Sequence, residues 1–142
     1  MSTGRFPYQT LEKYPGMKPE DVAVWDRFII ANPKYFDTCD YNVHVGEGAE
    51  TDPEHSEAMQ RDHTMLTQKK IDVVGYRGEA PSIVEVKPIA NMRALGQILV
   101  YERLFLDMHP ELVNVPLIIV CGEVERETDA LFLEHAIQIE IA

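Results

Sequence analysis

This chain of 142 residues has few cysteines and no long apolar run, and its first residues do not resemble a secretion leader. Its two cysteines, Cys39 and Cys121, lie far apart in the sequence, so we expect both thiols to be reduced and buried. No run approaches the roughly 18 apolar residues that a membrane span needs, and residues 1–14 lack the basic start of a secretion signal. The sequence therefore predicts a cytoplasmic protein without a membrane partner, built as one domain over residues 1–142.

Basic residues are also few. The 13 Lys and Arg residues face 24 Asp and Glu residues, and the resulting net charge of -11 argues against a tight, sequence-independent grip on duplex DNA by an isolated monomer. The exception is residues 61–103, where seven basic side chains outnumber five acidic ones. These basic side chains either follow a phosphate backbone or are ordinary solvated charges. We expect that either a homo-oligomer or a protein partner supplies the grip on DNA, or that the nucleic acid is small or structured, or that the site no longer cuts.

Two acids interrupt neighbouring apolar segments of the sequence. If these segments form an antiparallel hairpin that turns at Gly78 and Glu79, Asp72 falls opposite Glu85, because each acid lies six positions from the turn. Strand side chains alternate between the two faces of a sheet, so Lys87 projects from the same face as Glu85. The pattern predicts a cluster of two carboxylates and one ammonium group. An unpaired buried carboxylate costs several kcal/mol, so these acids need a reason to be there.

Such a cluster suits a hard divalent cation. We expect Mg²⁺ or Mn²⁺ to bind Asp72, Glu85, the backbone carbonyl of Val86 and waters. The cation would polarise a phosphate and stabilise the leaving oxygen, while Lys87 would position or help deprotonate the attacking water. This chemistry is hydrolysis of a phosphodiester. The structural alternative is a buried ion pair, either of Glu85 with Lys87 or of Asp72 with Lys70.

The helix expected after the hairpin carries a polar stripe. Residues 89–108 show the apolar spacing of an amphipathic helix, and along one of its faces small residues precede Gln97 and Tyr101. These two side chains could reach the strand ends and hydrogen-bond a phosphate or the attacking water. Alternatively, Gln97 is a surface amide and Tyr101 a core aromatic residue. Together with Lys70 and Arg93, Tyr101 is a candidate for binding the substrate.

These residues resemble the motifs of the PD-(D/E)XK nuclease superfamily. The resemblance is carried by Asp72, by the triplet Glu85-Val86-Lys87 and by the segment from Ala94 to Tyr101. It implies an α/β fold with a restriction endonuclease-like core, in which helices flank a central mixed β-sheet in the order helix, three strands, helix, strand. This chain offers those elements in order, with a further helix and strand at its end: residues 20–31, 36–45, 69–76, 82–87, 89–108, 115–121, 129–135 and 137–141.

The resemblance also assigns roles to individual residues. It implies that Asp72 and Glu85 bind the metal, that Lys87 is the catalytic lysine and that Gln97 assists from the helix.

Some branches of the superfamily add an acid from the first helix, where this chain has Glu20, Asp21 and Asp26. Glu20 and Asp21 follow Pro19 directly, and acids in a first helical turn interact favourably with the helix dipole. We therefore interpret these two acids as capping residues and Asp26 as a solvated one.

The segment 46–57 combines glycines, acids and a proline, and we interpret it as a long loop of the kind that forms a lid, a contact surface or an insertion. His44 lies on the polar side of its strand and is expected to be solvent-exposed. His55 and His63 lack a metal-ligand spacing, so neither receives a role.

Two functions from different classes remain open. The first is a metal-dependent nuclease that hydrolyses DNA in recombination, repair, restriction or viral genome processing. The second is a non-catalytic binding or assembly component, for instance of a viral particle or a nucleic-acid machine, that retains the nuclease fold. The intact cluster of Asp72, Glu85, Lys87 and Gln97 favours the first, whereas the acidity and small size of the chain favour the second.

Overall fold

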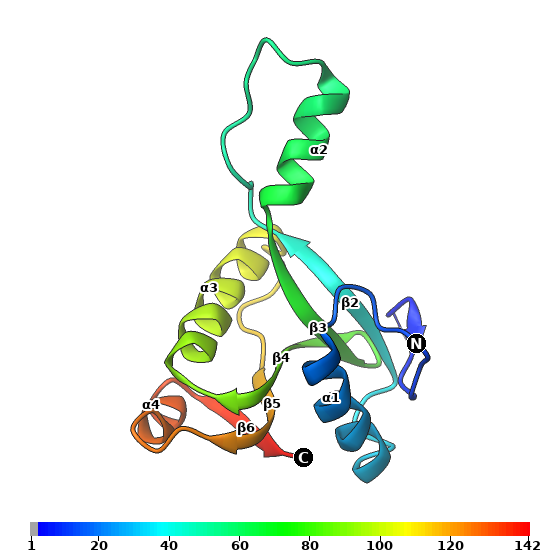
Figure 1. Cartoon of the computed structure of the whole chain (residues 1–142), viewed down its shortest axis with the longest axis vertical. Helices are drawn as coiled ribbons and strands as arrows, with labels where there is room; N and C mark the ends of the chain where they lie inside the picture. Colours follow the sequence, from blue (N-terminus) through cyan, green and yellow to red (C-terminus); the bar gives the residue numbers. More distant parts are fainter. Residues whose placement is uncertain (1–2) are drawn as a thin grey trace.

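Over residues 3–142, the computed structural model contains a six-stranded mixed β-sheet flanked by helices, which confirms the predicted α/β class (Figure 1). The strands lie across the sheet in chain order: β1 (Phe6–Pro7), β2 (Thr38–Val45), β3 (Lys69–Arg77), β4 (Ala80–Ala90), β5 (Leu117–Val124) and β6 (Ile137–Ile141). Strands β1 to β4 are antiparallel neighbours, whereas β5 runs parallel to β4 and β6 parallel to β5. The helices are α1 (Pro19–Ala31), α2 (Glu57–Thr67), α3 (Met92–Met108) and α4 (Asp129–Glu134).

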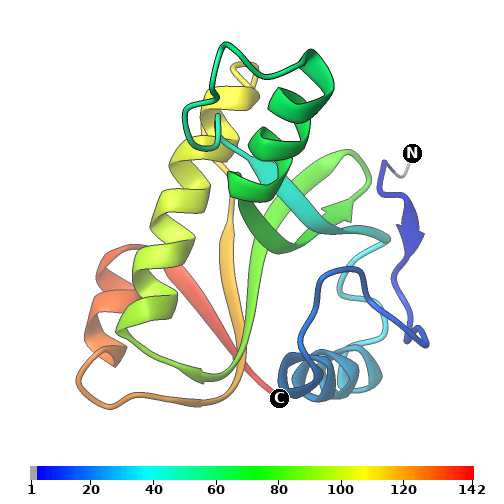
Figure 2. The same cartoon turned by 45° about the horizontal axis from the view of Figure 1, so that its top comes forward.

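Helices α1 and α3 cover opposite faces of the sheet around β4 and β5 (Figure 2). Alternation along β4 explains the two layers, because Val84 packs with Trp25 and Phe28 of α1 while Ile83 packs with Ile98 of α3. The apolar side chains between the sheet and α1, and those between the sheet and α3, are almost inaccessible to water. The centre of β4 is therefore buried on both sides. A charged residue placed there has no access to bulk solvent.

The predicted hairpin is confirmed. Strands β3 and β4 join through Gly78 and Glu79, and Gly78 has a φ of 59°, a conformation that favours glycine. The ladder pairs Val73 with Val84, and Asp72 and Glu85, which the sequence predicts to face each other, are the next residues in this register, just beyond the last pair.

Three elements differ from the predictions. Helix α2 begins where the predicted loop ends, and the sequence analysis assigned no helix to this segment. Strand β1 was not predicted either, because it has only two residues. Helix α3 begins at Met92 rather than at Ile89, because Asn91 caps it by accepting a hydrogen bond from the Ala94 amide at 3.0 Å, while β4 continues to Ala90.

The sheet opens at the two acids. Pairing between β3 and β4 ends at Val73 and Val84; beyond that point β3 pairs with β2 alone, and β4 pairs with β5. Figure 1 shows β3 curling away from β4 towards α2, which projects from the rest of the molecule. The sheet therefore splits at the point where Asp72 and Glu85 stand opposite each other.

Two glycines provide a test of the packing. In the Gly75→Ala variant the new methyl carbon would lie 2.6 Å from the ring of Phe36, which is buried and rigid, so we expect a loss of at least about 1 kcal/mol in the free energy of unfolding. In contrast, Gly96 lies inside α3 with no atom within 4 Å of such a methyl group. Gly96→Ala should therefore stabilise the protein by about 0.5–1 kcal/mol. Urea unfolding of both variants measures these changes, and equal shifts would contradict this packing.

Candidate active site

Asp72 lies at the split in the sheet and bridges its two arms. Its Oδ2 accepts a hydrogen bond at 3.0 Å from the backbone amide of Val86, which has no partner on β3 because the ladder has ended. The Val86 side chain is buried against α1, so Val86 contributes only backbone atoms to the site. The carboxylate of Asp72 thus fixes the arms relative to each other.

Glu85 is the most unusual residue of the cluster because it is only 2% exposed in the centre of the sheet. Burial raises the pKa of the Glu85 carboxyl group, and a hydrogen bond with Asp72 and the negative charge of Asp72 raise it further, while Lys87 opposes the rise. The ammonium group of Lys87 lies 3.7 Å from Glu85 Oε1. The other oxygen, Oε2, is buried and has no donor within residues 3–142, so the hydrogen bond with Asp72 requires a proton on one of the two carboxyl groups.

Of the two structural ion pairs considered from the sequence, Glu85 with Lys87 forms and Asp72 with Lys70 does not form within residues 3–142. This single pair does not satisfy Glu85, since Lys87 is itself partly exposed and one carboxyl oxygen stays unpaired. A buried acceptor without a donor costs about 1–3 kcal/mol or more when it is charged. A bound cation would remove that cost.

Helix α3 brings the predicted polar stripe to the cluster. Tyr101 of α3 is buried, and its pKa is raised by that burial and then by the charges of Glu85 and Asp72. Gln97 lies one turn earlier on the same face, and its Oε1 is buried without a hydrogen-bond partner within residues 3–142. Arg93 lies one turn earlier again; it is exposed, and its charge opposes the rise in the pKa of Tyr101.

Lys70 is placed differently from the other candidate residues. It lies on the arm of β3 that pairs with β2, opposite His44, and its ammonium group lies 3.5 Å from the carbonyl of Leu66 at the end of α2. No ion pair within residues 3–142 connects Lys70 to the cluster of acids. The structure thus brings together Asp72, Glu85, Lys87 and Tyr101, with Gln97 and Arg93 along the helix and Lys70 at the outer end of β3.

Asp21 of α1 lies in the first helical turn, as the sequence analysis expected of a capping residue, and the structure adds that its side chain is buried. It is 8% exposed, and burial raises its pKa to about 6, with a further rise from Asp72 and an opposing effect of Lys87. Its neighbour Glu20 is exposed, so the two acids of the first turn have different environments. The sequence could not separate them, because only the packing of α1 against β4 decides which of the two turns inward.

The Asp21→Asn variant tests this third acid. We expect it to weaken Mn²⁺ or Mg²⁺ binding, measured by calorimetry, by about 10-fold, the lower end of the effect seen when a residue that supports metal ligands is removed. Glu20→Gln is the matched control, since it removes the same charge one residue away on the exposed side. Equal affinities in the two variants would exclude Asp21 from the site.

The donor groups of this cluster fit a hard cation. Asp72 and Glu85 provide carboxylate oxygens, one of them buried and unpaired, and the backbone of Val86 lies between them. Within residues 3–142, no three side chains of His, Cys, Asp or Glu already stand in coordinating positions. A cation here would accordingly bind two carboxylates, with backbone and water oxygens completing its shell.

Comparison of the chain with protein-family models, with curated proteins and with solved structures finds no match. No helix among the described residues combines the length and the apolar character needed to cross a lipid bilayer.

Proposed function

We propose that the protein is a metal-dependent nuclease of the PD-(D/E)XK type, with a restriction endonuclease-like core and Asp72, Glu85 and Lys87 at its active site. One observation carries this proposal: Glu85 is buried at the split of the sheet beside Asp72 and Lys87, with one oxygen left unpaired. The ion pair with Lys87 accounts for only one of the two oxygens. A cation-binding site leaves one of them free for the metal.

The residues of the cluster have separate tasks in this proposal. When bound, Mg²⁺ or Mn²⁺ would polarise the phosphate and stabilise the leaving oxygen. Asp72 and Glu85 would hold it, and the hydrogen bond from the Val86 amide keeps Asp72 in place between the arms. Lys87, whose ammonium group is partly exposed and 3.7 Å from Glu85, would orient the attacking water and, once it has released a proton to solvent, would accept one from that water.

The stripe on α3 would guide the substrate. Arg93, Gln97 and Tyr101 follow one another at intervals of four residues, so they line one face of the helix, from the exposed Arg93 to the buried Tyr101. A phosphate could meet the guanidinium group of Arg93 first, then the side-chain NH₂ group of Gln97, and then the hydroxyl group of Tyr101. Lys70 would act on the other arm, where it could meet an adjacent phosphate.

One observation favours the second candidate function, an assembly component. Helix α2 has no buried residue, projects from the body and exposes Met59, Met65 and Leu66 (Figure 1). Large exposed apolar side chains on a projecting element are typical of a surface that contacts another protein. This surface is compatible with a nuclease that needs a partner, so it does not decide between the functions.

The deciding experiment incubates the purified chain with linear, nicked, single-stranded and branched DNA in Mg²⁺, in Mn²⁺ and in excess chelator. The proposal expects cleavage of at least one substrate that depends on the cation and is lost in Asp72→Ala. Binding of DNA without cleavage in any condition would favour the assembly function. Cleavage that persists in Asp72→Ala would show a contaminant and contradict the proposal.

A further inference from the structure

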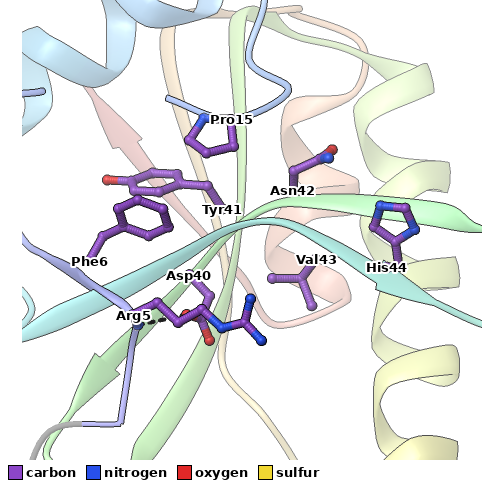
Figure 3. Close-up of a pocket in the computed structure, with 8 residues that line it drawn as sticks. All are labelled: Arg5, Phe6, Pro15, Asp40, Tyr41, Asn42, Val43 and His44. Carbon is purple, nitrogen blue, oxygen red and sulfur yellow. Dashed lines mark hydrogen bonds between the residues drawn. The ribbon is translucent and has the colours of Figure 1, made fainter. Parts of the chain in front are cut away.

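A groove of about 370 Å³ lies at the outer edge of β2, away from the residues described so far (Figure 3). It exists because β1 pairs with β2 only at Thr38 and Cys39, so that within residues 3–142 the edge of β2 beyond them has no neighbouring strand. The walls come from β2, from the start of the chain and from the turn that precedes α1. A volume in this range suits a small planar ligand or one unit of a polymer.

The groove adjoins the proposed active site. The ladder between β2 and β3 pairs Tyr41 with Val73, so its register places Asn42, which lines the groove, directly across from Asp72. The turn before α1 packs closely on Asn42, since any side chain at Gly16 would collide with the Asn42 amide. The segment that forms one wall of the groove therefore leads within a few residues to Asp21.

One part of the groove is apolar, with Phe6 and Pro15 partly exposed and Tyr41 buried behind them. The rings of Phe6 and Tyr41 lie 5.4 Å apart in an edge-to-face arrangement, and Figure 3 shows Pro15 above Tyr41. Aromatic and proline surfaces of this kind stack on planar rings with little dependence on the ring's identity.

The polar groups of the groove are available to a ligand, with one exception. Asp40 is fully engaged, because its oxygens accept hydrogen bonds from the Arg5 amide at 2.8 Å and from the Tyr76 hydroxyl at 3.3 Å. In contrast, the guanidinium group of Arg5 and the side-chain amide of Asn42 make no hydrogen bond or ion pair within residues 3–142. His44 uses one ring nitrogen to contact Gln68 at 3.3 Å, which leaves the other free.

Asn42 also adopts an uncommon backbone conformation. Its φ of 54° lies in the left-handed region, which costs a non-glycine residue roughly 1–2 kcal/mol, although asparagine tolerates it better than most. On either side of Asn42, Tyr41 packs with the apolar side chains beneath α1, while Val43 packs with those beneath α3. The residues that flank Asn42 on β2 therefore face opposite sides of the sheet. Asn42 has no pair in the ladder here, and its side-chain amide lies against Gly16 at the wall of the groove.

Building on the proposed nuclease function, we infer that this groove binds a nucleobase of the substrate strand, next to the phosphate held at Asp72 and Glu85. The base stacks against Phe6 and Pro15, whose side chains are partly exposed. The Asn42 amide, which offers both a donor and an acceptor, hydrogen-bonds the edge of the base. A base that enters the groove must be unpaired, so the preferred substrate is single-stranded or frayed beside the cut, which also suits a chain of net charge -11.

Cleavage of single-stranded oligonucleotides with one abasic site, moved nucleotide by nucleotide past the cut, tests this inference. We expect one position at which loss of the base lowers kcat/KM about 10-fold, in line with base-aromatic stacking. Two variants are compared with the native protein: Asn42→Gly, in which glycine can adopt the same backbone conformation, and Arg5→Ala. Both should cut intact DNA more slowly, and the abasic site should lower their kcat/KM by a smaller factor. Arg126→Ala, which removes an exposed charge between β5 and α4, is the matched control. A uniform abasic series, or variants that keep the full base effect, would overturn the inference.

A binding measurement separates this inference from the nuclease proposal. In chelator, the ¹⁵N-labelled protein is titrated with each deoxynucleoside monophosphate and with a six-residue oligothymidylate, while the side-chain signals of Asn42 and Arg5 are followed. Chemical-shift changes with the oligonucleotide but no cleavage with any metal would support base binding in the groove and contradict the nuclease proposal. Cleavage without such chemical-shift changes would support the nuclease proposal and contradict base binding in the groove. If a monophosphate binds as tightly as the oligonucleotide, the site belongs to a free nucleotide and the inference fails.

Discussion

Replacing Lys87 with alanine is expected to lower the rate of DNA cleavage by about 10²–10⁴-fold, the usual contribution of a positioned proton-transfer group. The reason is geometric, since Lys87 is the cation that the described structure sets beside Glu85, at 3.7 Å, and its partly exposed ammonium group can meet a water on the substrate side. Single-turnover cleavage at saturating Mg²⁺ measures the loss without interference from product release.

The matched control is Lys34→Ala, which removes an exposed ammonium group from the loop after α1. It should cut at the native rate. Because Glu85 loses its ionic partner in Lys87→Ala, melting curves must accompany the assay to show that the variant is folded. A folded Lys87→Ala variant that retains more than about a tenth of the native rate would remove Lys87 from the chemistry.

The core of the site was predictable because it depends on short-range geometry. Two apolar segments joined by Gly78 and Glu79 have one obvious register, and the period of two along a strand then determines which side chains share a face. Asp72, Glu85 and Lys87 are brought together by these two rules alone. The amphipathic spacing likewise oriented α3 so that Tyr101 meets the acids.

Other features depend on packing between distant segments, and no local pattern reveals them. Asp21 and Glu20 are equivalent in the sequence, and only the contact of α1 with β4 buries one of them. Helix α2 lacks a buried face, so the apolar periodicity that reveals most helices is missing there. The groove at Asn42 depends on a left-handed residue within a strand, which residue types alone rarely predict.

In a metal-free buffer, the Glu85→Gln variant is expected to be more stable than the native protein at alkaline pH. Burial, a hydrogen bond with Asp72 and the charge of Asp72 raise the pKa of Glu85 well above the value of 4.5 that applies to an exposed glutamate. At pH values between 4.5 and the raised pKa of Glu85, the folded state holds a proton that the unfolded chain has released. Stability therefore falls as pH rises through this range, by up to about 1.4 kcal/mol per pH unit for one proton.

Urea unfolding with chelator between pH 6.5 and 8.5 measures the effect, since this window lies above the pKa of about 6 for Asp21. The native protein should lose about 2–3 kcal/mol more than Glu85→Gln across the window, because the amide matches the protonated carboxyl group in shape and does not titrate. Glu79→Gln, at the exposed hairpin turn, should follow the native curve. Added Mg²⁺ should restore the stability of the native protein at pH 8.5, because binding to the folded state alone shifts the equilibrium, and should not affect Glu85→Gln. Parallel curves for the native protein and Glu85→Gln would mean that Glu85 is already ionised and satisfied without a metal, which would remove the observation on which the nuclease proposal rests.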